Sequence, residues 1–162
     1  MSYTPTIPLA GVAGWRFLER TQEKQQTAFE GSAEVKREIA YFQEKIGTIT
    51  SAADLVADRR LLNVALTAFG LEGDLDKKAF IRQVLDSDLN DTKSLASRLT
   101  NDSYYKLAQT FGFTGSPPAT AGVGFAAKII EPYKDRAFEG AVGAVNNNVR
   151  LVMNFKREIA SL

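Results

Sequence analysis

The sequence predicts an all-α fold. Apolar residues recur at intervals of three, four and seven over most of the chain, which is the spacing of helices that bury one face. Capping residues precede several of these segments, where helices would begin, and glycines follow them, where helices would end. No stretch combines strict alternation with β-branched enrichment, as a strand would. The 162 residues, 44% of them hydrophobic, therefore predict one helical domain with a substantial core.

The expected domain, residues 1–162, is a compact helical lobe flanked by long N- and C-terminal helices. Pro132 has no amide hydrogen to donate, so a kink is expected near it. The parts in chain order are a mobile arm at 1–14, N-terminal helices at 15–47, the lobe at 51–113, a loop at 114–124 and a long C-terminal helix at 125–162.

The lobe has the clearest helix-end signals. Ser51, with Asp54 three residues later, resembles a capping box. Gly70 and Gly112 are placed to end two helices. Asp102 is placed to cap the second of these. The lobe should therefore form from several short helices that pack on one another.

The two flanking segments predict a helical seam. Their apolar residues step by three, four or seven, the pattern of helices packed along one another. We expect residues 32–46 to pair with residues 133–160, as a bundle or a coiled-coil-like hairpin. Self-association, or docking to another helical protein, is the alternative. The seam residues are Val35, Ile39, Phe42, Ile46, Phe138, Val142, Val145, Val149, Val152 and Ile159.

Composition excludes several chemistries. The chain has no histidine and no cysteine, which removes the usual general base, thiolate metal sites and cysteine nucleophiles. We therefore expect a non-enzymatic protein with no catalytic residues, cofactor or metal. The net charge of +1 does not favour nucleic acid. No run approaches the roughly 20 apolar residues of a membrane span, and no cleavable secretion signal is seen, so a cytoplasmic location is one expectation.

Four local patterns have a chemical and a structural interpretation. Residues 86–97 begin like a calcium loop but lack its glycine and its closing glutamate. Asp54 and Asp58 have the spacing of a carboxylate pair, yet the adjacent Arg59 and Arg60 and the place of Asp54 in a first helical turn favour a structural role. Residues 122–124 do not match a phosphate loop. Tyr104 and its aromatic and basic neighbours could stack on a nucleic acid, but half-buried tyrosines are commoner. The structural interpretation is favoured in each case.

Two sequence fragments occur twice. Ala-Phe-Glu-Gly appears at 28–31 and 137–140, and Lys-Arg-Glu-Ile-Ala appears at 36–40 and 156–160. The two intervals differ by eleven residues, close to three helical turns, so both fragments could keep the same face. A duplicated helical element and chance in Lys/Glu-rich helices both remain open.

Several motifs in the same order resemble a known family. It is an alphaproteobacterial family of domains of unknown function whose genes tend to lie in flagellar gene clusters. Ser103 departs from the pattern, since a basic residue is usual there. The motifs are DLVADRRLL at 54–62, AFGL at 68–71, KAFIRQVL at 78–85 and YYKLA at 104–108.

The resemblance implies a cellular context and no mechanism. Members of the family have no established catalytic residues to transfer to this chain. It implies a structural or accessory protein associated with the flagellum, with flagellar components as partners. A helical adaptor for a non-flagellar protein is the alternative.

Overall fold

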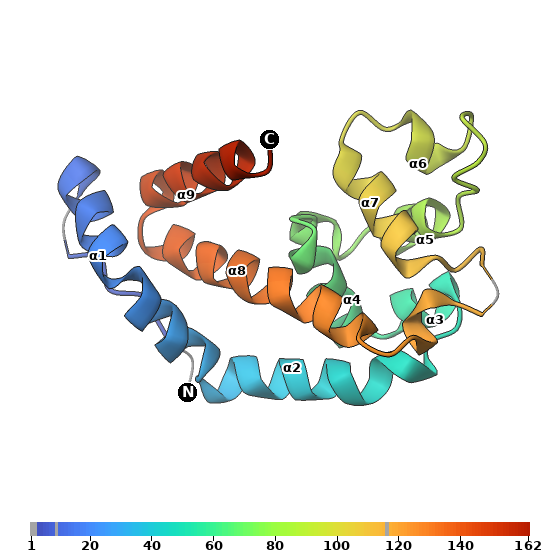
Figure 1. Ribbon diagram of the computed structural model, residues 1–162, viewed down its shortest axis with the longest axis horizontal. Coiled ribbons are helices and arrows are strands. Elements are labelled where there is room, and N and C mark those ends of the chain that lie inside the picture. Colours follow the sequence, from blue (N-terminus) through green and yellow to red (C-terminus); the bar gives the residue numbers. More distant parts are fainter. Residues whose placement is uncertain (1–2, 9, 116) are drawn as a thin grey trace. The chain divides into compact units, whose positions relative to one another are not determined.

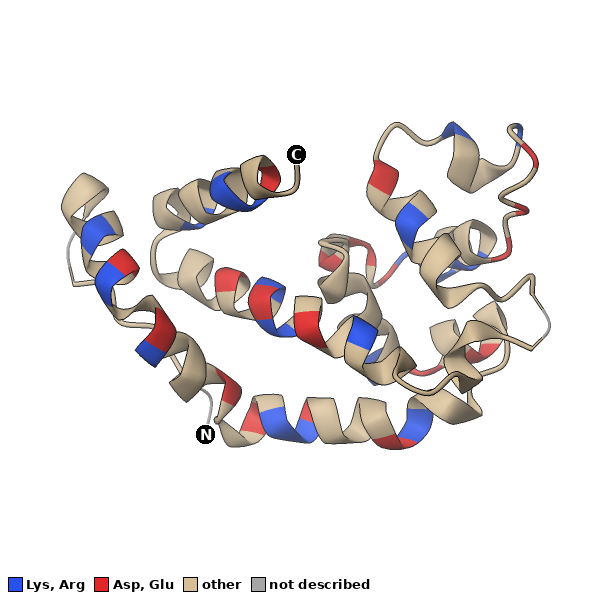
Figure 2. Cartoon of the chain, viewed as in Figure 1, with Lys and Arg blue, Asp and Glu red and all other residues tan. Residues whose placement is uncertain are grey.

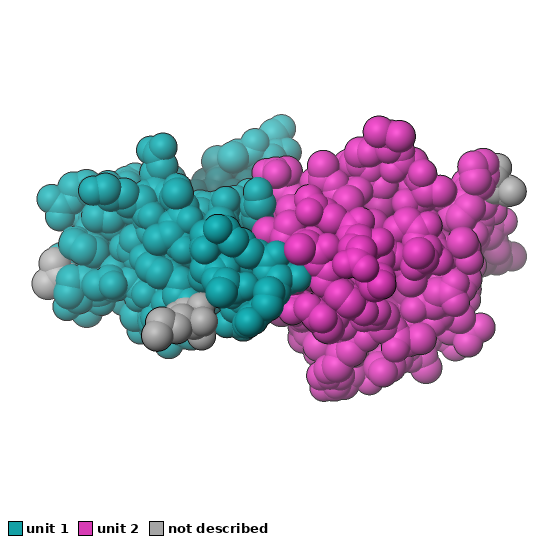
Figure 3. Space-filling model, turned by 90° about the horizontal axis from the view of Figure 1, so that it is seen from below, with its two compact units in different colours: residues 1–37, 134–162 teal, residues 38–133 magenta. Residues whose placement is uncertain are grey.

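The computed structural model describes residues 3–8, 10–115 and 117–162, and in these ranges the regular structure is helical, with no strand. This confirms the all-α prediction. The helices are labelled in Figure 1. The chain divides into two compact units, which Figure 3 shows in different colours. Unit 1 comprises residues 1–37 and 134–162, and unit 2 comprises residues 38–133. Two helices, α2 (Ala33–Lys45) and α8 (Phe125–Val145), contribute to both units.

Unit 1 is built on α1 (Gly11–Glu30), the second half of α8, and α9 (Asn147–Ala160). Helix α9 packs against α1, not on the predicted partner 32–46. The buried residues of this unit are few and come from all three helices. They include Leu18, Phe29, Phe138, Val142, Val149 and Met153.

A buried glutamine ties the N-terminal segment to α1. The Gln25 side chain is 7% exposed. Its Oε1 accepts a hydrogen bond from the Thr6 amide at 2.7 Å, and its Nε2 donates to the Thr6 carbonyl at 2.9 Å. The predicted helix start at Trp15 was late, because α1 begins at Gly11. Mobility of the arm stays a prediction.

Unit 2 has a dense apolar core. Its helices are α3 (Ala52–Ala57), α4 (Arg59–Ala68), α5 (Lys78–Leu85), α6 (Leu95–Arg98) and α7 (Asp102–Phe111), with the ends of α2 and α8. Three short 3-10 helices, at Ile46–Thr48, Glu72–Asp74 and Ala119–Ala121, join them. Fully buried residues come from six of these elements, among them Phe42, Leu55, Leu62, Ile81, Phe111 and Ile129.

The capping residues of the lobe explain its short helices. Ser51 Oγ accepts from the Asp54 amide at 3.1 Å, as the sequence predicts. Asp58 adopts an extended backbone and accepts from two amides of the next turn, which separates α3 from α4. Gly112 ends α7 in the left-handed region at φ 55°, a conformation that glycine adopts without strain.

The C-terminal region differs from the predicted long helix with a kink near Pro132. Helix α8 continues through Pro132. The chain instead breaks at Asn146, whose backbone is extended and whose Oδ1 accepts from the Val149 amide at 3.3 Å. A local cap at an Asn-rich site, which favours a helix start, thus divides the predicted helix into two.

The predicted loop at 114–124 is anchored in unit 2, as far as the structure describes it. Thr120 is 3% exposed, and its hydroxyl donates to the Ile49 carbonyl at 2.5 Å. This bond joins the loop to the turn that follows α2.

Candidate functional site

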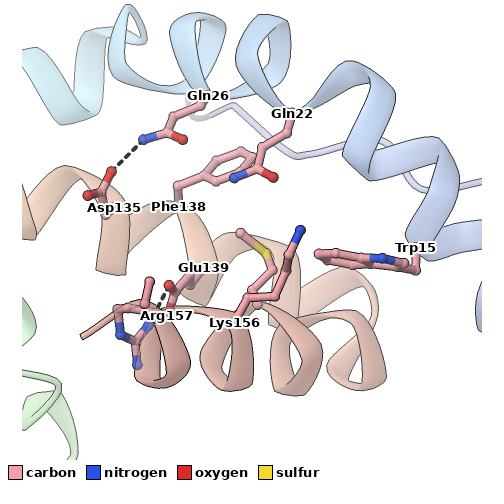
Figure 4. Close-up of a pocket in the computed structure, with 10 residues that line it drawn as sticks. Trp15, Gln22, Gln26, Asp135, Phe138, Glu139, Lys156 and Arg157 are labelled. Carbon is pink, nitrogen blue, oxygen red and sulfur yellow. Dashed lines mark hydrogen bonds and ion pairs between the residues drawn. The ribbon is translucent and has the colours of Figure 1, made fainter. Parts of the chain in front are cut away.

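Unit 1 contains a groove between α1, α8 and α9 (Figure 4). Its volume is about 400 Å³. It combines apolar walls with charged and amide groups, which is the composition of many binding sites. The lining residues are Trp15, Gln22, Gln26, Asp135, Phe138, Glu139, Met153, Lys156, Arg157 and Ala160.

One wall of the groove comes from a single face of α1. Trp15, Gln22 and Gln26 are seven and four residues apart, so they align along the helix. The Gln26 side-chain amide donates to Asp135 Oδ1 at 2.7 Å and to Glu30 Oε1 at 3.1 Å. Gln26 therefore joins α1 to α8.

The floor of the groove is apolar. Phe138 is fully buried and its ring centroid lies 5.7 Å from that of Phe29. Met153 of α9 is 7% exposed. Phe29 and Phe138 are the phenylalanines of the repeated Ala-Phe-Glu-Gly fragment, so the structure packs the two copies against each other. This contact leaves open whether the repeat arose by duplication.

A half-buried ion pair closes one end of the groove. Arg157 Nη1 donates to both carboxylate oxygens of Glu139, and Nη2 donates to Asn154. Glu139 is 8% exposed, and Arg157 is the cation that compensates its charge. Burial makes a lost partner costly, because the remaining charge would be left without compensation. The pair therefore joins α8 to α9.

The other end is closed by Trp15 and Lys156. The Lys156 ammonium lies 5.1 Å from the centroid of the Trp15 ring and 3.1 Å from Glu19 Oε1. A cation over an aromatic face is attracted by the ring quadrupole. Each charged side chain that lines the groove thus has a protein partner, and the groove offers its apolar floor as the main contact surface.

The predicted seam residues do not form one line. The N-terminal members Val35, Phe42 and Ile46 are buried, and Ile39 is partly buried. Of the C-terminal members, Phe138, Val142 and Val149 are buried, whereas Val145, Val152 and Ile159 are 42%, 38% and 53% exposed. Buried and exposed members occur together in α8 and again in α9, so these positions do not form one continuous buried line.

The paired carboxylates of the lobe serve as helix caps. Asp54 accepts from the Thr50 amide and hydroxyl, and these bonds, the amide first, lower the pKa of Asp54. Asp58 caps α4 and also accepts from the Tyr41 hydroxyl at 2.6 Å. This confirms the structural interpretation of the two carboxylates.

The polar turn at 86–91 likewise serves the backbone. Asp88 and Asp91 each accept from an amide two residues later, at 2.9 Å. In the described ranges no three acidic side chains converge so that they could hold a metal ion.

A contact that sequence reasoning missed connects Tyr104 to Asp74. The Tyr104 hydroxyl donates to Asp74 Oδ2, and Lys77 Nζ lies 2.8 Å from Asp74 Oδ1. The bond to Asp74 raises the pKa of Tyr104 to about 12. The bonds from Lys77 and Tyr104 lower the pKa of Asp74. The partners are thirty residues apart in the sequence, and no local pattern predicts the contact.

The fold defines a small all-helical protein with a helix-lined groove in unit 1. In the ranges that the structure describes, no helix has both the length and the apolar content to cross a bilayer.

Comparison with known families identifies the chain within that class. It belongs to a family described as protein of unknown function (DUF1217), whose model matches residues 68–162. The chain is also similar to the X-ray crystal structure of a protein from Agrobacterium tumefaciens. The two are 32% identical with a TM-score of 0.78, and the match covers 96% of this chain and 70% of the other. No curated protein matches.

Proposed function

We propose that this protein is a non-enzymatic structural or accessory protein associated with bacterial flagellar assembly, and that it acts through helical contacts with other proteins. The observation behind the contact role is the apolar surface of α9. Leu151, Phe155 and Ile159 are 56%, 66% and 53% exposed. A contiguous apolar patch of this kind is typical of interaction sites.

The flagellar part of the proposal has a separate basis. It comes from the sequence motifs at 54–62, 68–71, 78–85 and 104–108, which resemble a family whose genes tend to lie in flagellar clusters. Membership of the DUF1217 family supports the resemblance at the level of the family.

Gene deletion and complementation test both parts of this proposal. Deletion should reduce swimming in soft agar or the number of filaments, and the wild-type gene should restore both. Phe155→Asp should fail to restore them, because it places a charge in the apolar surface of α9. Asn147→Asp adds the same charge at an exposed position outside that surface and should restore motility. Normal swimming and normal filaments in the deletion strain would overturn the flagellar assignment.

Affinity capture separates the two partner classes. The tagged wild-type chain should recover flagellar components, and Phe155→Asp should recover less of them at equal expression. Consistent recovery of a non-flagellar protein, lost in the same variant, would instead favour a helical adaptor with another role.

A further inference from the structure

The connection between α8 and α9 is a single residue. Helix α8 ends at Val145 and α9 begins at Asn147, so only Asn146 between them is not helical. The chain turns closely there, because a Cβ added to Gly143 would lie 2.4 Å from the Cδ of Arg150. Helix α9 therefore leaves α8 through a tight turn with no spare residues.

The apolar spacing of the sequence continues through this turn. Four valines are spaced by three, four and three residues across Asn146, namely Val142, Val145, Val149 and Val152. Positions at these intervals lie on one face of a helix, so a helix that continued through Asn146 would align all four. In the turn, Val145 and Val152 are instead 42% and 38% exposed. The sequence is therefore compatible with a continuous helix as well as with the turn.

The surface that α9 covers on α1 and α8 is complementary to α9 in charge. Its carboxylates, Glu19 and Glu139, accept hydrogen bonds from Lys156 and Arg157 of α9. The charged residues of α9 itself are three basic and one acidic (Figure 2). Met153 adds an apolar contact and is 7% exposed. The helix that fits this surface is thus identified by the structure, and it is an α9 of this sequence.

These contacts require an α9, but not the α9 of the same chain. Glu139 and Arg157 are 18 residues apart, so on a continuous helix they would lie about 27 Å apart and could not meet. The α9 of a second copy, bound to the vacated surface, would restore this ion pair and the contact between Lys156 and Glu19. Exchange of an identical element is a low-cost route to a dimer, and short connections favour it.

We propose that two copies of this chain exchange α9. In the exchanged dimer, α8 and α9 form one continuous helix through Asn146, and each α9 covers α1 and α8 of the other copy. The monomer and the exchanged dimer share the contacts of α9 and differ at the turn. This inference goes beyond the flagellar role and does not use the exposed apolar surface of α9.

The first variants test whether the turn opposes exchange. Asn146→Ala removes a cap that only the turn contains, and it supplies a better helix former to the continuous helix. Each dimer opens two turns, so the dimerisation constant should rise by roughly 100-fold. Asn148→Ala makes the same change at an exposed position that is helical in both forms, and it should change the constant far less.

A proline at residue 147 should have the opposite effect. This residue is the first of α9, where a proline is tolerated because the amide there has no helical partner. Asn146 before it has an extended backbone, with φ −151° and ψ 99°, as a residue before proline prefers. In a continuous helix the same proline would remove a donor and clash with the preceding turn. Asn147→Pro should therefore fold as a monomer and not exchange.

Refolding of the full chain at high protein concentration, followed by size-exclusion chromatography with light scattering, measures the dimer fraction. The wild type should yield a dimer that dissociates slowly on dilution, because α9 must detach first. Circular dichroism shows that each variant is folded. An Asn146→Ala chain that stays monomeric at every concentration would overturn the proposal, and so would an Asn147→Pro chain that dimerises like the wild type.

A charge-reversal experiment distinguishes exchange from any other dimer. Glu139→Arg and Arg157→Glu each bring two like charges together within a closed chain. When the two variants are refolded together, exchange pairs residue 139 of one copy with residue 157 of the other, and both pairs become attractive. The mixture should recover helicity and form a mixed dimer, whereas each variant alone should not.

The double variant, with both changes in one chain, is the control for reversal of the pair. It should recover helicity without a second type of chain, because its own residues 139 and 157 attract. Recovery in the double variant with no recovery in the mixture would overturn the exchange of α9.

The exchange and the proposed function can fail independently. Phe155 is 66% exposed and lies outside the turn, so Phe155→Asp should exchange α9 like the wild type. A chain that never exchanges, but whose Phe155→Asp variant fails to restore motility, would overturn the exchange alone. A chain that exchanges, from a strain whose deletion swims normally, would overturn the flagellar role alone.

Discussion

The two units of this chain differ in where they place their apolar residues. Unit 2 buries most of them, among them Phe42, Leu62 and Phe111, and it has a buried cluster around Val84, Ala96 and Ala108. Unit 1 has a thinner core and is joined by polar contacts, such as the Gln25 and Glu139–Arg157 bonds. Among the described residues, the large hydrophobic side chains that are exposed belong to unit 1, with the exception of Val123.

We propose that this difference reflects a division of roles within one chain. A core that removes nearly all of its apolar surface from water is stabilised by the hydrophobic effect and requires no partner. A unit that keeps an apolar face in water can be stabilised further when a partner buries that face. Unit 2 thus has the features of a stable scaffold, and unit 1 those of a contact element. The single tryptophan, Trp15, lies in unit 1, so its fluorescence can report that unit separately.

The largest effect is expected in the core of unit 2. Phe111 is fully buried and its ring contacts those of Phe113 and Phe125. Phe111→Ala should lower the free energy of unfolding by about 3–5 kcal/mol, through lost burial and a residual cavity. Urea unfolding followed by circular dichroism measures this loss. The unfolding midpoint reported by Trp15 fluorescence should shift less.

The control for the Phe111 prediction is an exposed apolar residue of the same unit. Val123→Ala should change stability by less than about 0.5 kcal/mol, since that side chain is fully exposed. Equal shifts of the two probes in Phe111→Ala would show that the units unfold together, and the comparison would then be wrong.

A smaller effect is expected from the ion pair of unit 1. Arg157→Ala leaves the carboxylate of Glu139 buried without its partner, and should cost about 2–3 kcal/mol. The loss should appear in the Trp15 fluorescence transition. Arg59→Ala removes an exposed pair with Asp76 in unit 2 and should cost less than about 1 kcal/mol. Similar losses in the two variants would mean that burial does not strengthen the Glu139 contact.

The smallest effect concerns the Tyr104–Asp74 bond. Tyr104→Phe should cost about 1–2 kcal/mol near neutral pH. The folded-state pKa of Tyr104, raised to about 12, lies above its ordinary value near 10. Its stabilisation is therefore fully present below about pH 10 and is lost as the pH rises toward 12. The free energy of unfolding of the wild type should fall more steeply over this pH range than that of Tyr104→Phe.

Part of the loss of stability at alkaline pH should remain in the Tyr104→Phe variant. Tyr41 also has a raised pKa, because its hydroxyl donates to Asp58. The difference between the wild-type and variant pH curves isolates Tyr104. Identical slopes above pH 10 would contradict the assignment of this bond.

The sequence by itself determined the helical class and several helix ends. Ser51, Gly70 and Gly112 act within a few residues of their own position, through a cap bond or a left-handed backbone. Such signals are local, so they can be read without the fold. The seven-residue spacing of Val152 and Ile159 was also a real pattern, but both positions are exposed in α9.

Only the tertiary structure decided which face of α9 turns inward and which distant groups meet. Val152 and Met153 are adjacent in the sequence. Apolar residues repeat at helical spacing on both faces of α9, so periodicity alone cannot tell which face is buried. Packing against α1 and α8 buries Met153 and leaves Val152 at 38% exposure. In the same way, Tyr104 meets Asp74 because α7 and the turn at Glu72–Asp74 converge in space. These choices depend on contacts between distant segments, which local spacing does not encode.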